Sequence, residues 1–364
     1  MPELPDDDAL KAYAATEPER LHDLALAAAD RFQFAKLSRM LADQRSQEAT
    51  DWAVRLAEDL GEVREPESWR RLVRQIAWQL VQRPSIVGLR PQFESRTPVS
   101  PDDPGTEFRA CLLHELARLH GFNHPRDNDV YLSYGAGLRE LGHPLAWLPL
   151  NSFAFESRMN RYGRIEGGML GSENPKRLHA AYPVTPSTDG GTRAGRTARR
   201  VLDETRGDAA TTGFAQLCQY EAAFYTLPEP LDPADLNGAL LAELDAECLE
   251  FTTSDLLTTA HTTADDLAAD LFLADFAGGM WGEPQYGAYA RLHTWQSLYA
   301  VMDLAPEPPH QDAIRAAADH RWIRFALPRY TDNEWFTWDL TDTAFACLDP
   351  TRTRVTVLAA SETD

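Results

Sequence analysis

The residues best suited to chemistry lie in one stretch of the sequence, residues 278–293. Its first part is rich in glycine, which lets a backbone adopt positive φ or approach a neighbour closely. A helix is expected to begin near Gly287, and the free N–H groups of its first turn could receive an anion. Arg291 and His293, one turn further on, would add a positive charge or transfer a proton. The predicted ligand-binding residues are therefore Gly279, Trp281, Glu283, Tyr286, Arg291 and His293.

This stretch lacks the patterns that identify a reaction. It contains no GxGxxG dinucleotide fingerprint, no GK[ST] phosphate loop and no GxSxG nucleophile elbow. No nucleophile stands beside a base, so no catalytic residue is assigned and the sequence does not decide whether the protein is an enzyme. Because Gly-rich loops also close tight corners, a purely structural role competes with the ligand-binding interpretation.

One pair of residues only partly matches a zinc motif. His114-Glu115 begins like HExxH, but Arg118 occupies the fifth position. His120 follows His114 by six residues and so lies about 240° round a helix from it. The alternative to a metal site folded back on His124, Asp127, Asp129 and His143 is an ordinary surface pair between Glu115 and Arg118.

A second acidic group lies just before the Gly-rich stretch. Its members are Asp265, Asp266, Asp270 and Asp275. Asp266 and Asp270 are one helical turn apart and could hold a divalent cation, but a solvated helix face explains the group better. The sequence predicts no metal site and no cofactor.

Charge is distributed unevenly along the chain, whose net charge is −21. Residues 145–200 carry 9 basic and 4 acidic groups, whereas residues 201–364 carry 8 and 28. Between Arg206 and Arg291 there are fifteen acidic residues and no lysine or arginine. Such a surface repels nucleic acid and attracts basic proteins, although solubility alone is the competing explanation.

The basic run is Arg193, Arg196, Arg199 and Arg200. It lacks the aromatic neighbours expected of a single-strand nucleic-acid binder. We expect an intramolecular role for it, against the acidic part of the chain.

Composition favours a cytoplasmic bacterial protein. No apolar run approaches the ~20 residues of a membrane span, and the opening MPELPDDD lacks a basic signal-peptide region. The four cysteines form no CxxC pair, so no disulfide framework is expected. Only three of the 35 basic residues are lysines, which is typical of a high-GC genome.

Residues 6–142 read as successive amphipathic helices, within 18–32, 34–44, 48–60, 66–83 and 106–121. Gly61 and Gly121 are expected directly after two helix ends, and Pro66 at a helix start. Short connections between the helices predict a bundle or a short α-solenoid. Residues 91–104, rich in proline, are expected to form a surface loop.

From residue 144 the pattern becomes mixed. Strands are expected at 145–156, 213–227 (with a helix as the alternative), 271–273, 320–327, 334–338, 342–348 and 354–360. Helices are expected at 233–246, 255–261, 264–270, 288–303 and 311–319. The turn sequence at residues 349–353 predicts a terminal β-hairpin. The fold class is therefore α+β, with a helical domain at 1–143 and a mixed domain at 144–364 that includes an irregular segment at about 156–200.

One face of the 288–303 helix carries Ala288, Leu292, Trp295, Tyr299 and Met302. Trp295 should therefore be buried, with the terminal hairpin part of the same core. The alternating residues Phe345, Cys347, Val355 and Val357 are expected to cover this helix face. If Arg291 and Gly279 serve a ligand, substituting them should cost little stability.

Two segments, GGMWGEPQYGAYARLHTWQSLYAVMDL and WDLTDTAFACLDPTRTRVTVLAASETD, resemble an uncharacterised bacterial family of unknown function. In that family a Gly-rich stretch leads into a Tyr-Gly…Arg-Leu…Trp-x-Ser-Leu helix, and the chain closes with a strand, a turn and a Val-Leu-Ala-Ala-x-x-Thr-Asp end. The matching residues are Tyr286, Gly287, Arg291, Leu292, Trp295, Ser297, Leu298 and 357–364. The resemblance implies no activity.

Two functions follow as hypotheses. The first is a cytoplasmic interaction protein whose acidic C-terminal half recognises a basic protein partner, with neither nucleic acid nor membrane as partners. The alternative is an enzyme or small-ligand binder whose site is the Gly- and aromatic-rich loop at 278–287 and the helix start that follows.

Overall fold

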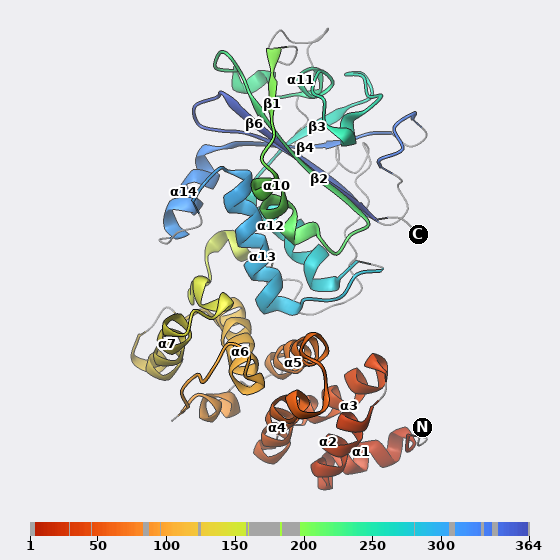
Figure 1. Cartoon of the computed structure of the whole chain (residues 1–364), viewed down its shortest axis with the longest axis vertical. Helices are drawn as coiled ribbons and strands as arrows, with labels where there is room; N and C mark the ends of the chain where they lie inside the picture. Colours follow the sequence, from red (N-terminus) through yellow and green to blue (C-terminus); the bar gives the residue numbers. More distant parts are fainter. Residues whose placement is uncertain are drawn as a thin grey trace. The chain divides into compact units, whose positions relative to one another are not determined.

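The protein is an α+β molecule, with helices in its first half and an antiparallel sheet in its second (Figure 1). The computed structural model describes residues 4–28, 30–44, 46–82, 87–94, 96–122, 125–157, 159, 183, 197–279, 281–305, 310–328, 331–336 and 341–362. The chain forms two compact units. The helical unit is Met1–Ser152 with Gln285–Tyr289, and the sheet unit is Phe153–Pro284 with Ala290–Asp364. That the predicted division at residues 143–144 separates independent domains stays a prediction.

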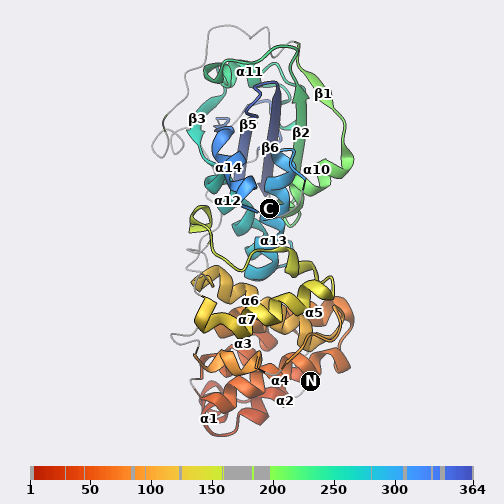
Figure 2. The ribbon, with the colours of Figure 1, turned by 90° about the vertical axis from the view of Figure 1, so that its left-hand side faces the viewer.

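The helical unit is a stack of antiparallel helices (Figure 2). Its elements are α1 (Asp7–Thr16), α2 (Pro18–Ala27), α3 (Arg31–Asp43), α4 (Gln47–Val63), α5 (Pro66–Val81), η1 (Val87–Gln92), α6 (Pro104–His120), α7 (Pro125–Glu140) and η2 (Pro144–Trp147). From α1 to α6 each helix packs on the next, and α1 to α4 also pack on the next but one. That pattern is typical of an α-solenoid, one of the two predicted arrangements.

Helix boundaries in this unit follow local capping. The predicted helix at 18–32 is interrupted, because Asp30 accepts the backbone N–H groups of Phe32 and Gln33 and starts α3. Gly121, with φ of 61°, ends α6 as predicted. The prediction for Gly61 is wrong, since α4 continues to Val63. Pro104 packs so closely on Gly61 that a Cβ there would overlap its ring.

The sheet unit contains a six-stranded sheet in the order β1-β2-β6-β5-β4-β3, antiparallel throughout. Its strands are β1 (Arg199–Val201), β2 (Gln219–Thr226), β3 (Thr258–Thr262), β4 (Arg321–Ala326), β5 (Thr341–Leu348) and β6 (Arg354–Glu362). The predicted terminal hairpin is confirmed and supplies the two central strands. Asp349 holds its turn by accepting the N–H groups of Thr353 and Arg354.

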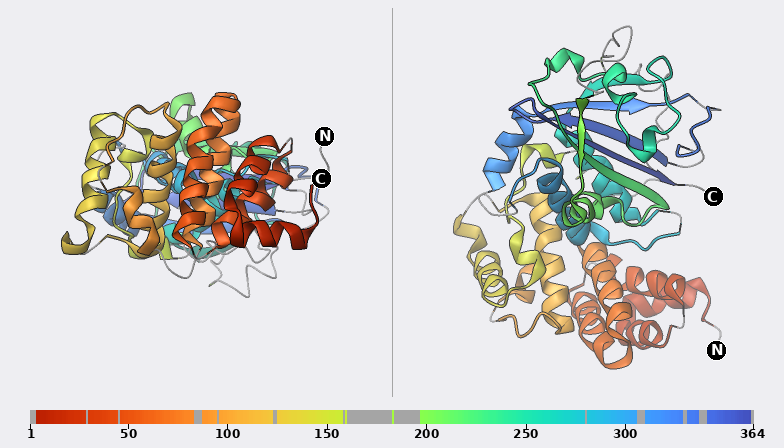
Figure 3. Two further views of the ribbon diagram at one scale, coloured as in Figure 1. Left: turned by 90° about the horizontal axis from the view of Figure 1, so that it is seen from below. Right: turned by 45° about the horizontal axis from the view of Figure 1, so that its top comes forward.

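The two faces of the sheet carry different covers (Figure 3). On one face, Ala346 and Val357 join an apolar cluster with leucines of the segment 227–257. On the opposite face lie α10 (Glu204–Thr211), α12 (Ala264–Ala277) and α13 (Tyr286–Val301), and Thr356 there donates to the carbonyl of Val301. Phe345 pairs with Leu358, so it lies on the face opposite to Val357. The predicted single surface of Phe345, Cys347, Val355 and Val357 is therefore wrong.

The segment between β2 and β3 is built from short turns rather than the predicted 233–246 helix. It contains η6 (Pro233–Asp235), α11 (Gly238–Leu241) and η7 (Glu247–Leu249). Asp232 accepts the N–H of Ala234, and Asn237 accepts that of Ala239. Because the second cap begins a new helical turn only a few residues after the first, neither turn extends into a long helix.

Three further predictions are wrong. Residues 271–273 belong to α12, which is buried on almost every side and so shows no helical period. Residues 145–156 contain η2 and η3 (Ala154–Ser157) instead of a strand. The predicted helix at 255–261 is largely strand β3.

The other elements of the sheet unit are η5 (Thr212–Phe214) and α14 (His310–Asp319). Trp335 and Phe336 are buried outside the strands, while residues 337–338 lie outside the described part of the chain. Among the helices that the structure describes, none has the length and apolarity to cross a membrane.

Candidate functional site

The glycines of the predicted loop sit where no side chain fits. Gly278 ends α12 with φ of 82°, and Gly279 follows with φ of 60°. A Cβ on Gly279 would come within 2.5 Å of the Glu362 carboxylate and 2.8 Å of the Gln216 carbonyl oxygen. The backbone of Glu283 donates to the side chain of Gln216 at 2.9 Å. These contacts give the glycines a structural role in closing the corner after α12.

Two predicted side chains of this loop lie on the surface. Trp281 is 71% exposed, and Glu283 is also exposed. Tyr286 opens α13 with φ of 56°, and its ring stacks on Trp78 at 5.7 Å. Burial raises the pKa of Tyr286 to about 12, so the phenol stays neutral at physiological pH.

The first turn of α13 already holds an anion, the Glu115 carboxylate. The backbone N–H of Ala288 donates to Glu115 at 3.1 Å, and Gly287 leaves room for it, because a Cβ there would overlap the carboxylate. Arg118 donates to Glu115 at 2.8 Å, and neither side chain exceeds 1% exposure. The predicted surface pair of Glu115 and Arg118 is therefore wrong, and α6 carries a buried ion pair instead.

A second buried polar group of the helical unit centres on Glu107. Its carboxylate accepts from Arg74 at 3.3 Å and from the Tyr289 hydroxyl at 3.2 Å, and His143 lies 3.1 Å away. Burial alone would raise the pKa of Glu107, but hydrogen bonding to His143 and the charge of Arg74 hold it below its usual value. Arg74 also lies 3.5 Å from the centre of the Tyr289 ring.

Arg291 is completely buried in the sheet unit. Its Nε and Nη2 donate to Glu156 at 2.6 and 3.0 Å, and the Trp295 indole N–H donates to the same carboxylate at 2.9 Å. This bidentate pair makes Arg291 part of the core, against the expectation that its substitution would cost little. Trp295 is 1% exposed, so its predicted burial is confirmed.

The sequence reasoning missed Glu156 as the partner of Arg291. The two residues are separated by 135 positions, and no periodicity relates them. One signal was present, because Glu156 is the single acidic residue in the otherwise apolar stretch LAWLPLNSFAFE. A lone carboxylate in such surroundings requires a buried positive partner.

His293 combines chemistry with partial exposure. Its Nδ1 lies 2.6 Å from the carboxylate of Asp275, which is fully buried, while the imidazole is 22% exposed. A carboxylate in this position fixes the orientation of a histidine ring.

The acidic group Asp265, Asp266, Asp270 and Asp275 is not the solvated helix face that we expected. Asp266 caps α12 through Thr263, and Asp270 pairs with Arg324 at 2.7 Å. Asp275 pairs with His293. Asp265 is half-buried, and no described residue forms an ion pair with it. Within the described residues, no three His, Cys, Asp or Glu side chains are grouped to hold a metal ion. His124 lies outside those residues.

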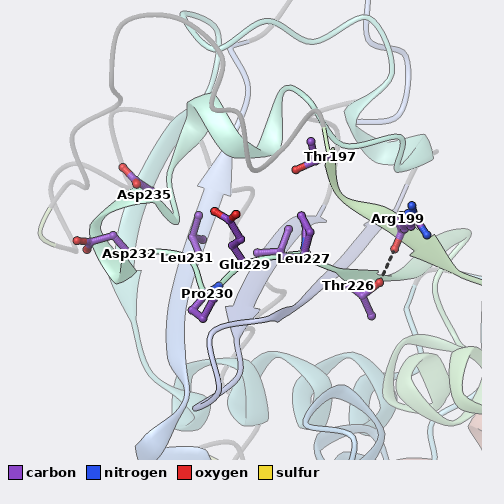
Figure 4. Close-up of a pocket in the computed structure, with 10 residues that line it drawn as sticks. Thr197, Arg199, Thr226, Leu227, Glu229, Pro230, Leu231, Asp232 and Asp235 are labelled. Atoms are coloured by element: carbon purple, nitrogen blue, oxygen red, sulfur yellow. Dashed lines mark hydrogen bonds between the residues drawn. The ribbon is translucent and has the colours of Figure 1, made fainter.

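Acidic residues gather instead on the segment between β2 and β3. Its leucines face the sheet, and its outer side carries the carboxylates of Glu229, Asp232, Asp235, Asp245, Glu247, Glu250 and Asp255, here called the acidic surface. At one end Glu229, Asp232 and Asp235 line a cavity of about 770 Å³, with Thr197 and Arg199 on its other side (Figure 4). No described residue forms an ion pair with any of the seven carboxylates.

Arg200, from the predicted basic run, contacts acidic residues of the sheet unit. Arg200 donates to the Glu221 carboxylate at 2.9 Å and to the Asp245 carbonyl oxygen at 2.7 Å. Arg193 and Arg196 lie outside the described residues.

The structure thus defines an α+β protein with a helical solenoid and an antiparallel sheet whose two central strands form the terminal hairpin. Over residues 8–364 the chain matches a family of unknown function, DUF6183, and it belongs to that family. This confirms the predicted resemblance to an uncharacterised family. No curated protein and no solved structure matches the chain.

Proposed function

We propose that this protein binds a basic protein partner through the acidic surface of its sheet unit. The observation that carries the proposal is the set of seven carboxylates on the segment 229–255, none of which pairs with a described cation. Like charges held together raise the local negative potential, and a positively charged partner relieves it. Electrostatic complementarity of this kind sets partner choice and association rate.

The support beneath the acidic surface favours binding over mere solubility. Leu231, Leu236, Leu240 and Leu249 are almost fully buried against the sheet, so the short turns between them are held in place. A charged surface on an anchored segment loses less conformational entropy on binding than one on a loose loop. The cavity beside Glu229 adds a recess that could admit a long basic side chain.

The test measures binding to an arginine-rich peptide at ~50 and ~500 mM salt. We expect the dissociation constant to rise at least tenfold across this range, because salt screens exposed charges over that interval. The triple variant Glu229→Gln, Glu247→Gln and Glu250→Gln should bind more weakly at low salt and lose most of the salt dependence.

A matched control separates position from net charge. Glu48, Glu62 and Glu140 are exposed in the helical unit, and their conversion to Gln changes the net charge by the same amount. This control should bind like the unmodified protein. Equal weakening by both triple variants, or affinity independent of salt, would exclude the acidic surface as the binding site.

The pair of Asp275 and His293 favours a second candidate, an enzyme or small-ligand binder near the loop at 278–287. A histidine oriented by a buried carboxylate is an arrangement that sites of general acid–base catalysis use. Thermal shift with nucleotides, sugar phosphates and small acids tests this candidate, since a ligand at ~100 times its Kd stabilises by about 2.7 kcal/mol. A stabilising ligand whose effect survives His293→Gln would argue against this site.

A further inference from the structure

A second cavity, of about 380 Å³, lies within the sheet unit among α12, α13, α14 and the start of β4. Its apolar walls include Trp295 and Leu298 from α13, Met302 just after α13, Ile314 from α14 and Trp322 from β4. The volume is at the small end of ligand pockets. Apolar walls of this kind bury the ring or short chain of a small molecule.

One wall of this cavity carries a guanidinium that has no anionic partner among the residues that the structure describes. Arg321 lines the cavity, and no described carboxylate pairs with it. Its Nη2 lies 2.6 Å from the ring nitrogens of His261, and its buried Nε has no hydrogen-bond acceptor among the described residues. Since a guanidinium only donates, His261 accepts through an unprotonated nitrogen. Buried donors without acceptors are rare, and each calls for a missing partner.

The two histidines near Arg321 add no charge to the cavity. Burial and the adjacent Arg321 lower the pKa of His261. Burial likewise lowers the pKa of His320, which also lines the cavity and lies 2.6 Å from the Ala316 carbonyl oxygen. Both imidazoles are therefore neutral at physiological pH, so Arg321 is the positive charge among the described lining residues.

The N-terminus of α12 supports the same end of the cavity. Thr262, Thr263, Ala264 and Asp265 line it, and the first turn of a helix presents a positive dipole end. Asp265 is half-buried there and places a negative charge on the rim, so an anion has to sit nearer Arg321 than Asp265.

We propose that this cavity binds a small organic carboxylate with an aromatic or short aliphatic tail. The carboxylate pairs with Arg321, and the tail packs on Trp295, Leu298 and Trp322. The proposal is independent of the acidic surface, which lies on the other face of the sheet.

Calorimetric titration of the full chain with indole-3-acetate tests it, with indole-3-acetamide and tryptamine as neutral and cationic analogues. We expect saturable binding of the carboxylate, and binding of the amide and amine at least tenfold weaker. Arg321→Met should weaken indole-3-acetate binding about 10- to 100-fold, the range for losing a charge-assisted hydrogen bond. Arg315→Met is the control, because Arg315 is exposed on α14 and does not line the cavity.

Each contrary result is decisive. Absence of saturable binding up to ~10 mM, or equal affinity for the three analogues, overturns the proposal. So does unchanged affinity in an Arg321→Met variant that retains the circular dichroism spectrum of the unmodified protein. Ile314→Trp, which fills the cavity from α14, gives a second readout and should abolish binding without removing any charge.

Discussion

Replacing Glu156 by Gln should destabilise the sheet unit more than most single substitutions. The Glu156 carboxylate accepts two hydrogen bonds from Arg291, one from the Trp295 indole and one from the Phe153 backbone. Gln keeps the size of the side chain but removes its charge and turns one acceptor into a donor. Arg291, with no exposed surface, would then keep its charge without its counter-ion.

The expected cost is about 3–5 kcal/mol, the usual range for breaking a buried ion pair by removing one partner. This is a large share of the ~5–15 kcal/mol that stabilises a typical domain. The opening equilibrium of the sheet unit should rise roughly 10²- to 10⁴-fold, since each ~1.4 kcal/mol is tenfold.

Hydrogen–deuterium exchange, measured peptide by peptide, is the suitable assay because the chain has two compact units. Peptides from residues 290–301 should lose protection, while those from α2 to α4 should not. The exposed control Glu229→Gln should stay within about 0.5 kcal/mol of the unmodified protein.

The double variant Glu156→Gln with Arg291→Met tests the cause of the loss. With both charges gone, the total should be clearly smaller than the sum of the two single losses. A loss below about 1 kcal/mol for Glu156→Gln, or strict additivity in the double variant, would refute the ion pair as a stabilising core element.

Further changes have equally definite outcomes. Trp295→Ala should lower the free energy of unfolding, measured with urea, by about 3–5 kcal/mol, because it leaves a cavity in the core. A loss under about 1 kcal/mol would contradict the core position of Trp295. Gly279→Ala should lower the melting temperature, because φ of 60° alone costs about 1–2 kcal/mol in a residue with a Cβ. Deleting residues 343–364 should leave the sheet unit unfolded by circular dichroism, since two central strands are lost. The pKa of the Glu107 carboxyl is below its usual 4.5, so this group stabilises the fold above pH 4.5. The contribution is lost as the pH falls through the pKa of Glu107 in the folded protein. In Glu107→Gln, the free energy of unfolding should therefore fall less steeply as the solution is acidified.

Local signals in the sequence were enough for several elements. The solenoid helices were predicted from apolar periodicity with Pro66 and Gly121 as boundaries, and the terminal hairpin from the turn around Asp349. In each case residues close in sequence determine the structure. Where two caps compete, as at Asp232 and Asn237, local reasoning chose one long helix and the chain formed short turns.

Contacts between residues far apart in the sequence could not be predicted from local patterns. The predicted loop was correctly seen as unusual, but its glycines are explained by Gln216 and Glu362, which approach from other elements. The anion expected at the α13 N-terminus turned out to be Glu115, which had been assigned to the surface. Residues 271–273 were misread because a helix buried on all sides has no polar face to reveal its period.

The position of β6 has a consequence for how the protein is made. This strand, residues 354–362, lies between β2 and β5 and pairs with both along most of its length. While a ribosome is still synthesising those residues, β2 and β5 each have an open hydrogen-bonding edge, whereas the solenoid helices meet their neighbours soon after they emerge. In nascent chains the helical unit should therefore be folded while the sheet is still incomplete, with open strand edges that can pair with other chains. A frameshift or early stop before residue 354 would leave those edges permanently open and produce an aggregating protein rather than a merely inactive one.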